Sequence, residues 1–312
     1  MFDLYCIGGS SVDLVLKVPS VPVSDQKLIA EFSGVYSGGL VANTACAAAA
    51  LGLTVGWHGQ VGDDDFGRQF LRDFDHFGVQ HDTTQVIRNQ MTDLCIILVE
   101  PAGERTILVV PTNEEPPNLP ASVMQALAQC GIVYSLPWAA EWFKPIAEIV
   151  RSNQGKIAID LEASSPVQGE ALNEILSLAD MVFCSQGGMD LITKGADIKS
   201  GIRHLFNLGV QTVITTHGSQ GAAVHTPDAT YSTPAFNNID LVDTTGAGDC
   251  FHAAYIAALH DDASLSDAIQ FAAAAAALAI QHLGARNGLP NRTMVNNFLA
   301  HHTLKQQRGM GN

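Results

Sequence analysis

Residues 243–249 read Asp-Thr-Thr-Gly-Ala-Gly-Asp and lead directly into an apolar stretch, residues 250–259. Gly246 and Gly248 flank a single alanine, so the chain can turn tightly at this point. The helix that follows would direct unpaired amide N–H groups, and the positive end of its dipole, at the turn. The stretch therefore predicts a helix that begins at an anion-binding turn.

Asp249 falls on the first turn of this helix, beside the predicted anion site. A carboxylate repels a phosphate, so its position indicates a chemical role: it would accept the proton of a hydroxyl that attacks a phosphoryl group. We predict Asp249 as the general base of a kinase, and the amides of Gly246, Ala247 and Gly248 as its anion hole. The alternative is an ordinary loop before a helix, with the aspartate as N-cap.

A second glycine turn precedes a second helix. Residues 37–43 read Ser-Gly-Gly-Leu-Val-Ala-Asn, and alanines follow. The backbone at Gly38 and Gly39 can approach a ligand because no side chain intervenes. Asn43 offers donors and an acceptor, which suits a sugar hydroxyl. The alternative is a glycine-capped core helix in which the asparagine is satisfied internally.

Together these segments resemble the signatures of the PfkB carbohydrate kinases, the ribokinase-like family. The resemblance extends over most of the chain. It is carried by an opening strand with Gly8, Gly9 and Asp13, by residues 37–43, Val61–Gly67, Gly103–Thr106 and Thr216–Gly221, and by residues 243–249. It implies a ribokinase-like fold, ATP and Mg²⁺ as cofactors, and a small sugar as substrate.

The order of apolar segments predicts an α/β fold. Short apolar strands alternate with helices, which is typical of a parallel sheet covered by helices on both faces. Strands are expected at residues 4–8, 54–60, 133–135, 156–160, 182–185 and 213–216, and helices at 42–51, 67–77, 142–152 and 202–207. We predict a three-layer α/β/α body formed by residues 1–11, 34–91 and 111–312.

Two stretches break this order because they alternate polar and apolar residues: 12–18 with 27–33, and 92–100 with 105–110. They predict antiparallel strands of a small β-sheet outside the body, assigned to residues 12–33 and 92–110. Residues 114–120 would return the chain to the body. In the resembled family such a sheet is a lid over the sugar and often pairs with a second copy, which implies a homodimer. The alternative is an edge decoration.

The resemblance implies further contacts with the substrate. Asp13 and Asn43 would bind sugar hydroxyls, Asp13 because it closes the first strand at the crevice formed by the carboxyl ends of parallel strands. A turn role is the alternative for Asp13. Lys27 and Arg105, on the lid, would meet the substrate or incoming phosphates, unless they are solvated lid charges.

Other segments are expected on the nucleotide side. Thr216, Gly218, Ser219 and Gly221 form a glycine loop after a strand, which borders the nucleotide in the resembled family, together with Thr245. An alanine-rich helix from Ser264 to His282, with a capping-box start and a stop at Gly284, would lie beside the adenine. Asp243 and Thr245 are candidates to hold a monovalent cation.

The sequence departs from the family pattern at the expected magnesium site. An Asn-x-x-Glu motif is replaced by Ser-Gln-Gly-Gly at residues 185–188, and Asp-Pro-Asn-x-Arg is replaced by Asp-Leu-Glu-Ala-Ser at residues 160–164. Mg²⁺ would then be held through water and by Asp160 or Glu162. These substitutions resemble the ketohexokinase and sulfofructose kinase branch more than ribokinase.

The composition excludes several classes of partner. The 312 residues are 47% hydrophobic, enough for a sizeable core, and carry a formal net charge of −15. Such a charge argues against binding to nucleic acid or to acidic membranes. No apolar run is long enough to span a bilayer, and the N-terminus lacks the basic region of a signal peptide. The six scattered cysteines suit reduced thiols in a cytoplasmic protein.

We therefore predict an ATP-dependent kinase that phosphorylates a primary hydroxyl of a small, ketose-like sugar. One alternative is a nucleoside kinase, whose base would need an aromatic clamp from Phe32, Tyr36 or Trp138. The other is a sugar-binding or regulatory protein that has lost catalysis. Loss of the acid at residues 185–188 favours that alternative, whereas retention of Asp249 and its glycine turn opposes it.

Overall fold

The structure is a computed structural model that describes residues 1–101, 104–112, 116–195, 197–237 and 239–309. Side chains are described up to His302. Gly103 of the expected Gly-Glu-Arg-Thr motif lies outside the described residues. So do Glu114 and Glu115, the first residues of the loop predicted to return the chain from the lid.

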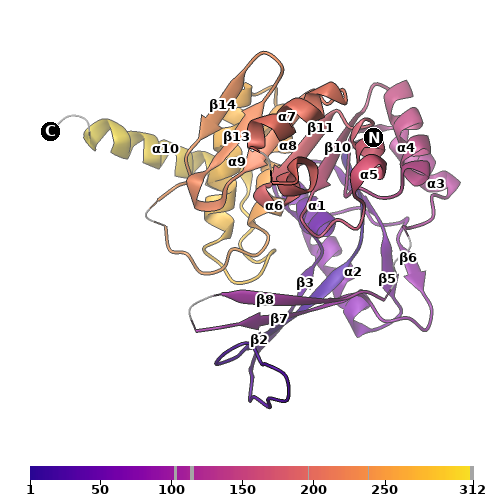
Figure 1. Cartoon of the computed structure of the whole chain (residues 1–312), viewed down its shortest axis with the longest axis vertical. Helices are drawn as coiled ribbons and strands as arrows, with labels where there is room; N and C mark the ends of the chain where they lie inside the picture. Colours follow the sequence, from indigo (N-terminus) through magenta and orange to yellow (C-terminus); the bar gives the residue numbers. More distant parts are fainter. Residues whose placement is uncertain (102–103, 113–115, 196, 238, 310–312) are drawn as a thin grey trace.

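An eight-stranded sheet forms the centre of the described chain, in the order β14-β13-β12-β11-β10-β9-β1-β4 (Figure 1). The strands from β12 to β4 are parallel to one another, and β13 and β14 add an antiparallel edge. Their bounds are β1 Phe2–Ile7, β4 Val55–His58, β9 Cys130–Ser135, β10 Lys156–Leu161, β11 Met181–Ser185, β12 Thr212–Thr216, β13 Ala222–His225 and β14 Thr230–Thr233. The predicted mostly parallel sheet is confirmed.

Helices cover both faces of this sheet. Alternate residues of β1 divide between two cores, because successive side chains of a strand point to opposite faces: Leu4 and Cys6 enter one, Tyr5 and Ile7 the other. The first core is closed by α1 Leu40–Ala50, α2 Asp65–Phe77, α8 Ala247–His260, α9 Leu265–Ala279 and α10 Arg292–Gly309. The second is closed by α3 Ala121–Leu127, α4 Ala140–Ser152, α5 Gly169–Leu176, α6 Gln186–Thr193 and α7 Ile198–Asn207. The predicted three layers are confirmed.

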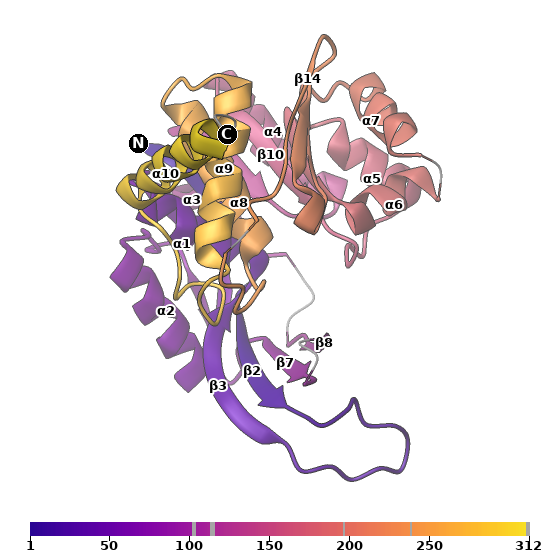
Figure 2. The ribbon, with the colours of Figure 1, turned by 90° about the vertical axis from the view of Figure 1, so that its left-hand side faces the viewer.

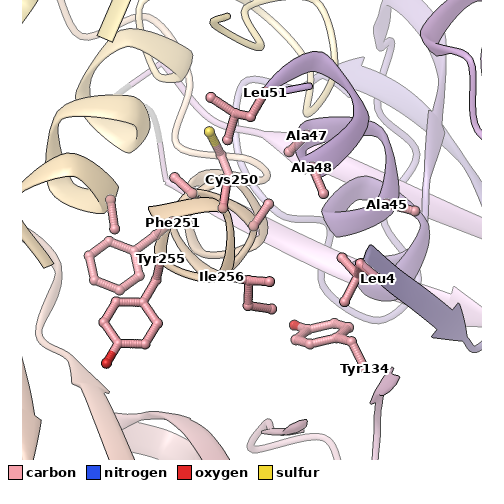
Figure 3. Close-up of a cluster of buried hydrophobic side chains, with 14 of the residues drawn as sticks. Leu4, Ala45, Ala47, Ala48, Leu51, Tyr134, Cys250, Phe251, Tyr255 and Ile256 are labelled. Carbon is pink, nitrogen blue, oxygen red and sulfur yellow. The ribbon is translucent and has the colours of Figure 1, made fainter. Parts of the chain in front are cut away.

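Alanines bring α1 and α8 close together. Ala45 and Ala48 of α1 belong to the same buried cluster as Cys250 and Ile256 of α8 (Figure 3). Small side chains let two helix backbones approach each other. This packing fixes the distance between the starts of the two helices, where the glycine turns lie.

A second, four-stranded sheet projects from the body, in the order β3-β2-β7-β8 (Figure 2). Its strands are β2 Ser11–Lys17, β3 Glu31–Gly38, β7 Leu94–Val99 and β8 Arg105–Val110. The pairs β2–β3 and β7–β8 are antiparallel as predicted, and β2 joins β7 in parallel. The predicted separate small sheet is present.

The strand β3 differs from its predicted bounds. It was expected at residues 27–33 but runs from Glu31 to Gly38. The register shifts between Val15 and Leu16 of β2, which pair with Gly34 and Phe32, so Ser33 is an extra residue. Gly34 has a positive φ of 150° at this bulge. A β-bulge thus accommodates Ser33 and Gly34 inside the strand, which continues beyond its predicted end.

The strand predicted at residues 54–60 is divided. Its first part is β4, and its second part, β5 Gln60–Gly62, pairs with β6 Gln85–Ile87 in a separate two-stranded sheet. Gly59 lies at the break, where an added Cβ would stand 2.1 Å from the carbonyl oxygen of Gly8. Close contact with the backbone of Gly8 ends the strand there. The pattern of apolar residues did not predict this break.

The motif at residues 61–67 joins α2 to the small sheet. Asp64 caps α2, and its Oδ1 accepts from the amide of Gly67 at 2.8 Å. The hydroxyl of Thr92, just before β7, donates to the same carboxylate oxygen at 2.7 Å. The helix therefore begins before the predicted Gly67, and the motif has a structural role.

Ser264 caps α9 at the predicted start: its hydroxyl accepts from the amide of Asp267 at 3.2 Å and donates to Asp267 Oδ2 at 2.7 Å. The helix ends at Ala279, before the predicted His282. Across the described residues, none of the helices combines the length and the hydropathy that crossing a bilayer would require.

Candidate active site

The turn before α8 requires a glycine. Gly246 has a φ of 75°, in the left-handed region, and an added Cβ there would lie 2.7 Å from Cβ of Ala285. Gly248 meets nothing within 4 Å, so open space lies above it. The helix begins at Ala247 with no side-chain cap. The alternative that Asp249 serves as an N-cap is therefore wrong. The amide of Ala247 donates to Thr244 O at 3.2 Å, whereas the amides of Gly246 and Gly248 make no hydrogen bond within the described residues and can face an anion.

Asp249 and Asn43 are joined by a buried hydrogen bond. Asn43 Nδ2 donates to Asp249 Oδ2 at 2.8 Å, and each residue is 4% exposed. Asn43 lies on the first turn of α1 and Asp249 on the first turn of α8. The asparagine therefore holds one oxygen of the predicted base.

The surroundings of Asp249 shift its acidity toward neutrality. Burial raises the pKa of this carboxyl to about 7, helped by the nearby carboxylates of Glu162 and Asp13. The hydrogen bond from Asn43 and the positive charge of Arg286 oppose the rise. A base is most effective when its pKa lies near the working pH. The environment thus suits proton transfer at neutral pH.

A cavity of about 350 Å³ lies between the small sheet and the loop that contains residues 243–245. Its polar lining comes from Asp13, Arg105 and residues 243–245, and its apolar lining includes Val15, Tyr36, Ile97, Val99, Leu241, Val242 and Leu283. Asn43 and Asp249 do not line it. Asp13 connects the two regions, since it faces the cavity and its charge acts on Asp249.

Asp13 was predicted to close the first strand, and this is wrong. It lies within β2, where it is paired with Tyr36 of β3 and Cys95 of β7. Its side chain is buried, and Ser11 Oγ donates to its Oδ1 at 3.4 Å. Burial raises the pKa of Asp13 to about 6. It is a strand residue of the small sheet, so the alternative turn role is also wrong.

Arg105 connects β8 to the glycine turn. Its Nη1 lies 3.0 Å from Asp243 Oδ1, and its guanidinium also donates to the hydroxyls of Thr244 and Thr245. Asp243 in turn accepts from the Thr245 hydroxyl at 2.7 Å. Lys27 is exposed in the connection between β2 and β3 and does not line the cavity. Of the two predicted lid cations, the structure therefore brings only Arg105 to the site.

Gly38 and Gly39 are required by packing. An added Cβ at Gly38 would lie 2.5 Å from Asp13 Oδ1, and Gly39 has a φ of 91° with Gly9 O only 3.0 Å from an added Cβ. The missing side chains therefore make room for protein atoms that belong to the site. Their predicted contact with a ligand stays a prediction.

The second glycine loop lies at the carboxyl end of β12. Thr216 is the last residue of this strand, Gly218 and Ser219 form an exposed turn, and Gly221 has a φ of 101°. An added Cβ at Gly221 would stand 2.1 Å from Thr233 O. The loop does not line the cavity at Asp13.

The two acids predicted to hold a metal differ in exposure. Asp160 is fully buried, and Tyr134 donates to its Oδ2 at 2.9 Å while the same hydroxyl lies 2.8 Å from His252 Nδ1. Glu162 is partly exposed, and burial raises its pKa. Among the described side chains, no group of three His, Cys, Asp or Glu residues is arranged to hold a metal ion. Glu162 is thus the acid that a cation could reach.

Three buried residues near the site were missed by sequence reasoning: Arg286, Tyr134 and His252. Arg286 contacts Asn43 and Gly38. Tyr134 donates to Asp160 and lies 2.8 Å from His252 Nδ1, and His252 follows Asp249 on the same helix. Their positions gave weak signals: Tyr134 lies in a predicted strand, His252 follows Asp249 in the apolar stretch 250–259, and Arg286 follows the Gly284 predicted as a helix stop.

The chain resembles known kinases along nearly its whole length. It is 30% identical over 325 residues to the aminoimidazole riboside kinase of Salmonella typhimurium, covering 98% of each chain. It is 27% identical over 308 residues to the ribokinase of Haemophilus influenzae, covering 96% of this chain and 98% of that one. The structure of Arabidopsis thaliana ribokinase complexed with ribose and ATP matches with a TM-score of 0.86 at 24% identity, over 96% of this chain and 98% of that one.

The small sheet, the two glycine turns and the buried aspartate of α8 thus occur in a chain whose relatives are kinases of sugars and ribosides. Carbohydrate kinases are phosphotransferases that use a hydroxyl group as acceptor. The family profile described as pfkB family carbohydrate kinase matches residues 1–292. The chain belongs to the pfkB family of carbohydrate kinases.

Proposed function

We propose that this chain is an ATP-dependent kinase that phosphorylates a primary hydroxyl of a small, ketose-like sugar. The observation that carries the proposal is the buried Asp249, held by Asn43 at the open start of α8. The ribokinases of Haemophilus influenzae and Arabidopsis thaliana, the latter complexed with ribose and ATP, support a small sugar and ATP as the substrates. The altered residues 160–164 and 185–188 support a ketose rather than ribose.

In the proposed reaction, the oxygen of the sugar hydroxyl attacks the terminal phosphorus of ATP, and Asp249 accepts the proton of that hydroxyl. The bond from that phosphorus to the bridging oxygen breaks, and ADP leaves with the electron pair. The amides of Gly246, Ala247 and Gly248 would stabilise the charge on the transferring group, together with the positive end of the α8 dipole. Asp13 and Arg105 would orient the sugar in the cavity that they line.

ATP would lie across the carboxyl edge of the sheet, bordered by Thr216, Gly218, Ser219, Gly221 and Thr245, with α9 beside the adenine. Glu162, which is partly exposed and acts electrostatically on Asp249, would hold Mg²⁺ through water, and Asp160 would support it from the interior. Bound Mg²⁺ would neutralise charge on the donor phosphates. The carboxylate of Asp243 beside Thr245 is the proposed place for a monovalent cation.

A nucleoside kinase is the second candidate, because much of the cavity lining is apolar. Of the three aromatic residues considered for a base clamp, Tyr36 lines this cavity. Phe32 is 64% exposed, and Trp138 lines a different cavity of about 50 Å³. The aminoimidazole riboside kinase of Salmonella typhimurium supports an acceptor with a ring attached to the sugar.

The small sheet is also the proposed dimer contact. Strand β8 lies at its edge, and all residues of β8 from Arg105 to Val110 are exposed. Ile107 and Val109 are 54% and 65% exposed. An apolar edge strand pairs readily with another chain. A second copy would cover it and extend the lid.

A single assay separates these candidates. Phosphoryl transfer from ATP would be measured with a panel of ketoses, ribose and nucleosides, for the wild type and for Asp249→Asn. We expect a ketose to give the highest kcat/KM, and Asp249→Asn to lower kcat about 100-fold to 10,000-fold, the usual effect of losing a general base. A nucleoside as best acceptor would support the second candidate. If no acceptor is phosphorylated but a sugar raises Tm, the chain is a sugar-binding protein.

A further inference from the structure

Arg286 is buried beside the two glycine turns. It follows Gly284 and Ala285, which contact the turn at residues 243–249: the amide of Gly284 donates to Asp243 Oδ2 at 2.8 Å, and Ala285 packs against Gly246. Arg286 is only 6% exposed. Its guanidinium carbon lies 4.8 Å from the centroid of the Phe70 ring in α2. The side chain therefore points into the protein, with its guanidinium over the Phe70 ring and away from solvent.

The hydrogen bonds of Arg286 go to neutral groups of the site. Its Nε donates to Asn43 Oδ1 at 2.9 Å, and its Nη2 donates to the carbonyl of Gly38 at 2.7 Å. The nearest carboxylate, Asp73, is 38% exposed and stands 3.8 Å from Nη1. Burying a charge without a close ion pair is costly. Such an arrangement is expected where the charge has a functional role.

Arg286 determines which way the Asn43 amide points. A guanidinium only donates hydrogen bonds, so the atom of Asn43 that faces it must be the carbonyl oxygen. The amino group then has to face Asp249 Oδ2, at 2.8 Å. A flipped amide would set two donors against each other at Arg286 and two acceptors against each other at Asp249. The arginine thus makes Asn43 a donor to the carboxylate.

The charge of Arg286 acts on the same carboxylates. It lowers the pKa of Asp249 and of Asp13, against the rise caused by burial. Other groups that act on Asp249 or sit next to it are the acids and hydroxyl of neighbouring elements and the adjacent thiol: Asp13, Asp160, Glu162, Tyr134 and Cys250. Arg286 is the cation that acts on Asp249. Its loss would leave the base more protonated at neutral pH.

We infer that Arg286 is a positioning residue, which acts through Asn43 to hold the Asp249 carboxylate oriented and ionised for proton transfer. The inference rests on the proposed function, in which Asp249 is the base. It assigns to Arg286 no contact with the sugar or with ATP. Its effect should therefore appear in kcat and in the pH profile more than in KM.

The test compares Arg286→Gln, Arg286→Lys and Arg292→Gln with the wild type. Arg292 is a matched control: it is also partly buried in the C-terminal region, but it binds Leu51 O and Asp261, away from the site. Arg286→Gln should lower kcat about 10-fold to 100-fold, the effect of losing a hydrogen bond within a charged network. It should also shift the acid limb of kcat to higher pH. Arg286→Lys keeps the charge, so kcat should rise with pH over the same range as in the wild type. The value of kcat should recover only in part, because lysine cannot make both hydrogen bonds of the guanidinium.

Arg292→Gln should lower Tm and leave kcat and the pH profile unchanged. The inference is overturned if Arg286→Gln folds and keeps the wild-type kcat and pH profile, or if Arg292→Gln changes both equally. Should Arg286→Gln fail to fold, Arg286→Lys decides, since an unchanged kcat would contradict the positioning role.

A second measurement needs no turnover. An NMR titration of the Asp249 carboxyl carbon should give a higher pKa in Arg286→Gln than in the wild type, and an equal pKa in the two would overturn the inference. If the wild type phosphorylates none of the acceptors, the proposed function fails while this titration still tests the role of Arg286.

Discussion

Asn43 and Asp249 lie 206 positions apart in the sequence, yet Asn43 Nδ2 donates to Asp249 Oδ2 at 2.8 Å. The bond joins the first turn of α1 to the first turn of α8, whose alanines let the two helices pack closely (Figure 3). The position of the proposed base therefore depends on the packing of two helices as well as on its own turn.

The activity and the stability of the protein should depend on pH through Asp249. Burial raises the pKa of this carboxyl to about 7, so the ionised base forms as the pH rises and kcat/KM should increase between about pH 6 and pH 8. The effect on stability has the opposite sign, because the folded state holds the proton more tightly than the unfolded chain. The contribution of Asp249 to the stability of the fold is therefore fully present below the ordinary aspartate pKa of about 4. It is lost as the pH rises through about 7.

Thermal unfolding of the wild type and of Asp249→Asn between pH 5 and pH 8 measures this effect. The asparagine cannot ionise, so the Tm of the variant relative to that of the wild type should rise with pH. A constant difference in Tm over this range would show that the carboxyl titrates outside it.

Two glycines of the turn should respond differently to alanine. Gly246→Ala places a Cβ at a φ of 75° and 2.7 Å from Ala285 Cβ, so it should lower the free energy of unfolding by about 1 to 3 kcal/mol. Gly248 lies within α8 and an added Cβ meets nothing within 4 Å, so Gly248→Ala should keep or slightly raise stability. Its methyl group would occupy the space proposed for the phosphoryl group, and kcat should fall at least about tenfold.

Urea unfolding and steady-state kinetics of both variants check this pair. A Gly248→Ala enzyme with wild-type kcat would mean that the transferring group does not pass over this turn.

The sequence predicted the elements whose pattern is local. Alternating apolar strands and helices gave the parallel sheet, and the turn at residues 243–249 gave the start of α8 with Asp249 on it. The same reasoning failed where a distant backbone decides the geometry. Gly59 ends a strand because of Gly8 O, and β3 continues through Gly34 because of a bulge opposite Val15 and Leu16.

The site follows the same rule. Asn43 was predicted from its place after a glycine turn, but its two partners come from distant segments. One of them, Arg286, is marked in the sequence by no more than its place after Gly284. Lys27 and Arg105 looked equivalent as lid cations. Only the pairing of β7 with β8 brings Arg105 onto the same face as Val99 and hence into the cavity.

Arg105 and Lys27 should therefore differ in their effect on substrate affinity. Arg105→Ala removes a charged lining of the cavity and should raise KM for the sugar at least about tenfold, since single pocket contacts contribute about 1 to 3 kcal/mol. Stability should change by no more than about 1 kcal/mol, because the contact of Arg105 with Asp243 is a partly exposed ion pair. Lys27→Ala is the control and should leave KM unchanged. A larger KM effect of Lys27→Ala would place the substrate under the loop between β2 and β3 instead.

The edge strand β8 should decide the oligomeric state. Pairing with β7 leaves its other edge open, and residues 107 to 110 present apolar side chains on both faces of the sheet. An apolar strand of this kind is stable in water when a partner covers it, and a specific contact between chains buries at least about 1,000 Å² in total. We therefore expect the wild type to sediment as a dimer at micromolar concentration.

Val109→Lys should convert this dimer into a monomer, because the ammonium group would have to be buried without a partner where a 65% exposed valine now lies. Val86→Lys is the matched control: Val86 is 50% exposed on β6, in a different sheet, and its replacement should leave the dimer intact. Analytical ultracentrifugation distinguishes the two. A wild type that sediments as a monomer would contradict the proposed dimer, and a Val109→Lys variant that stays dimeric would place the dimer contact away from β8. Arg105 of β8 lines the cavity, so the monomeric variant should also have a raised KM for the sugar. A monomer with an unchanged KM would show that substrate binding does not depend on the dimer.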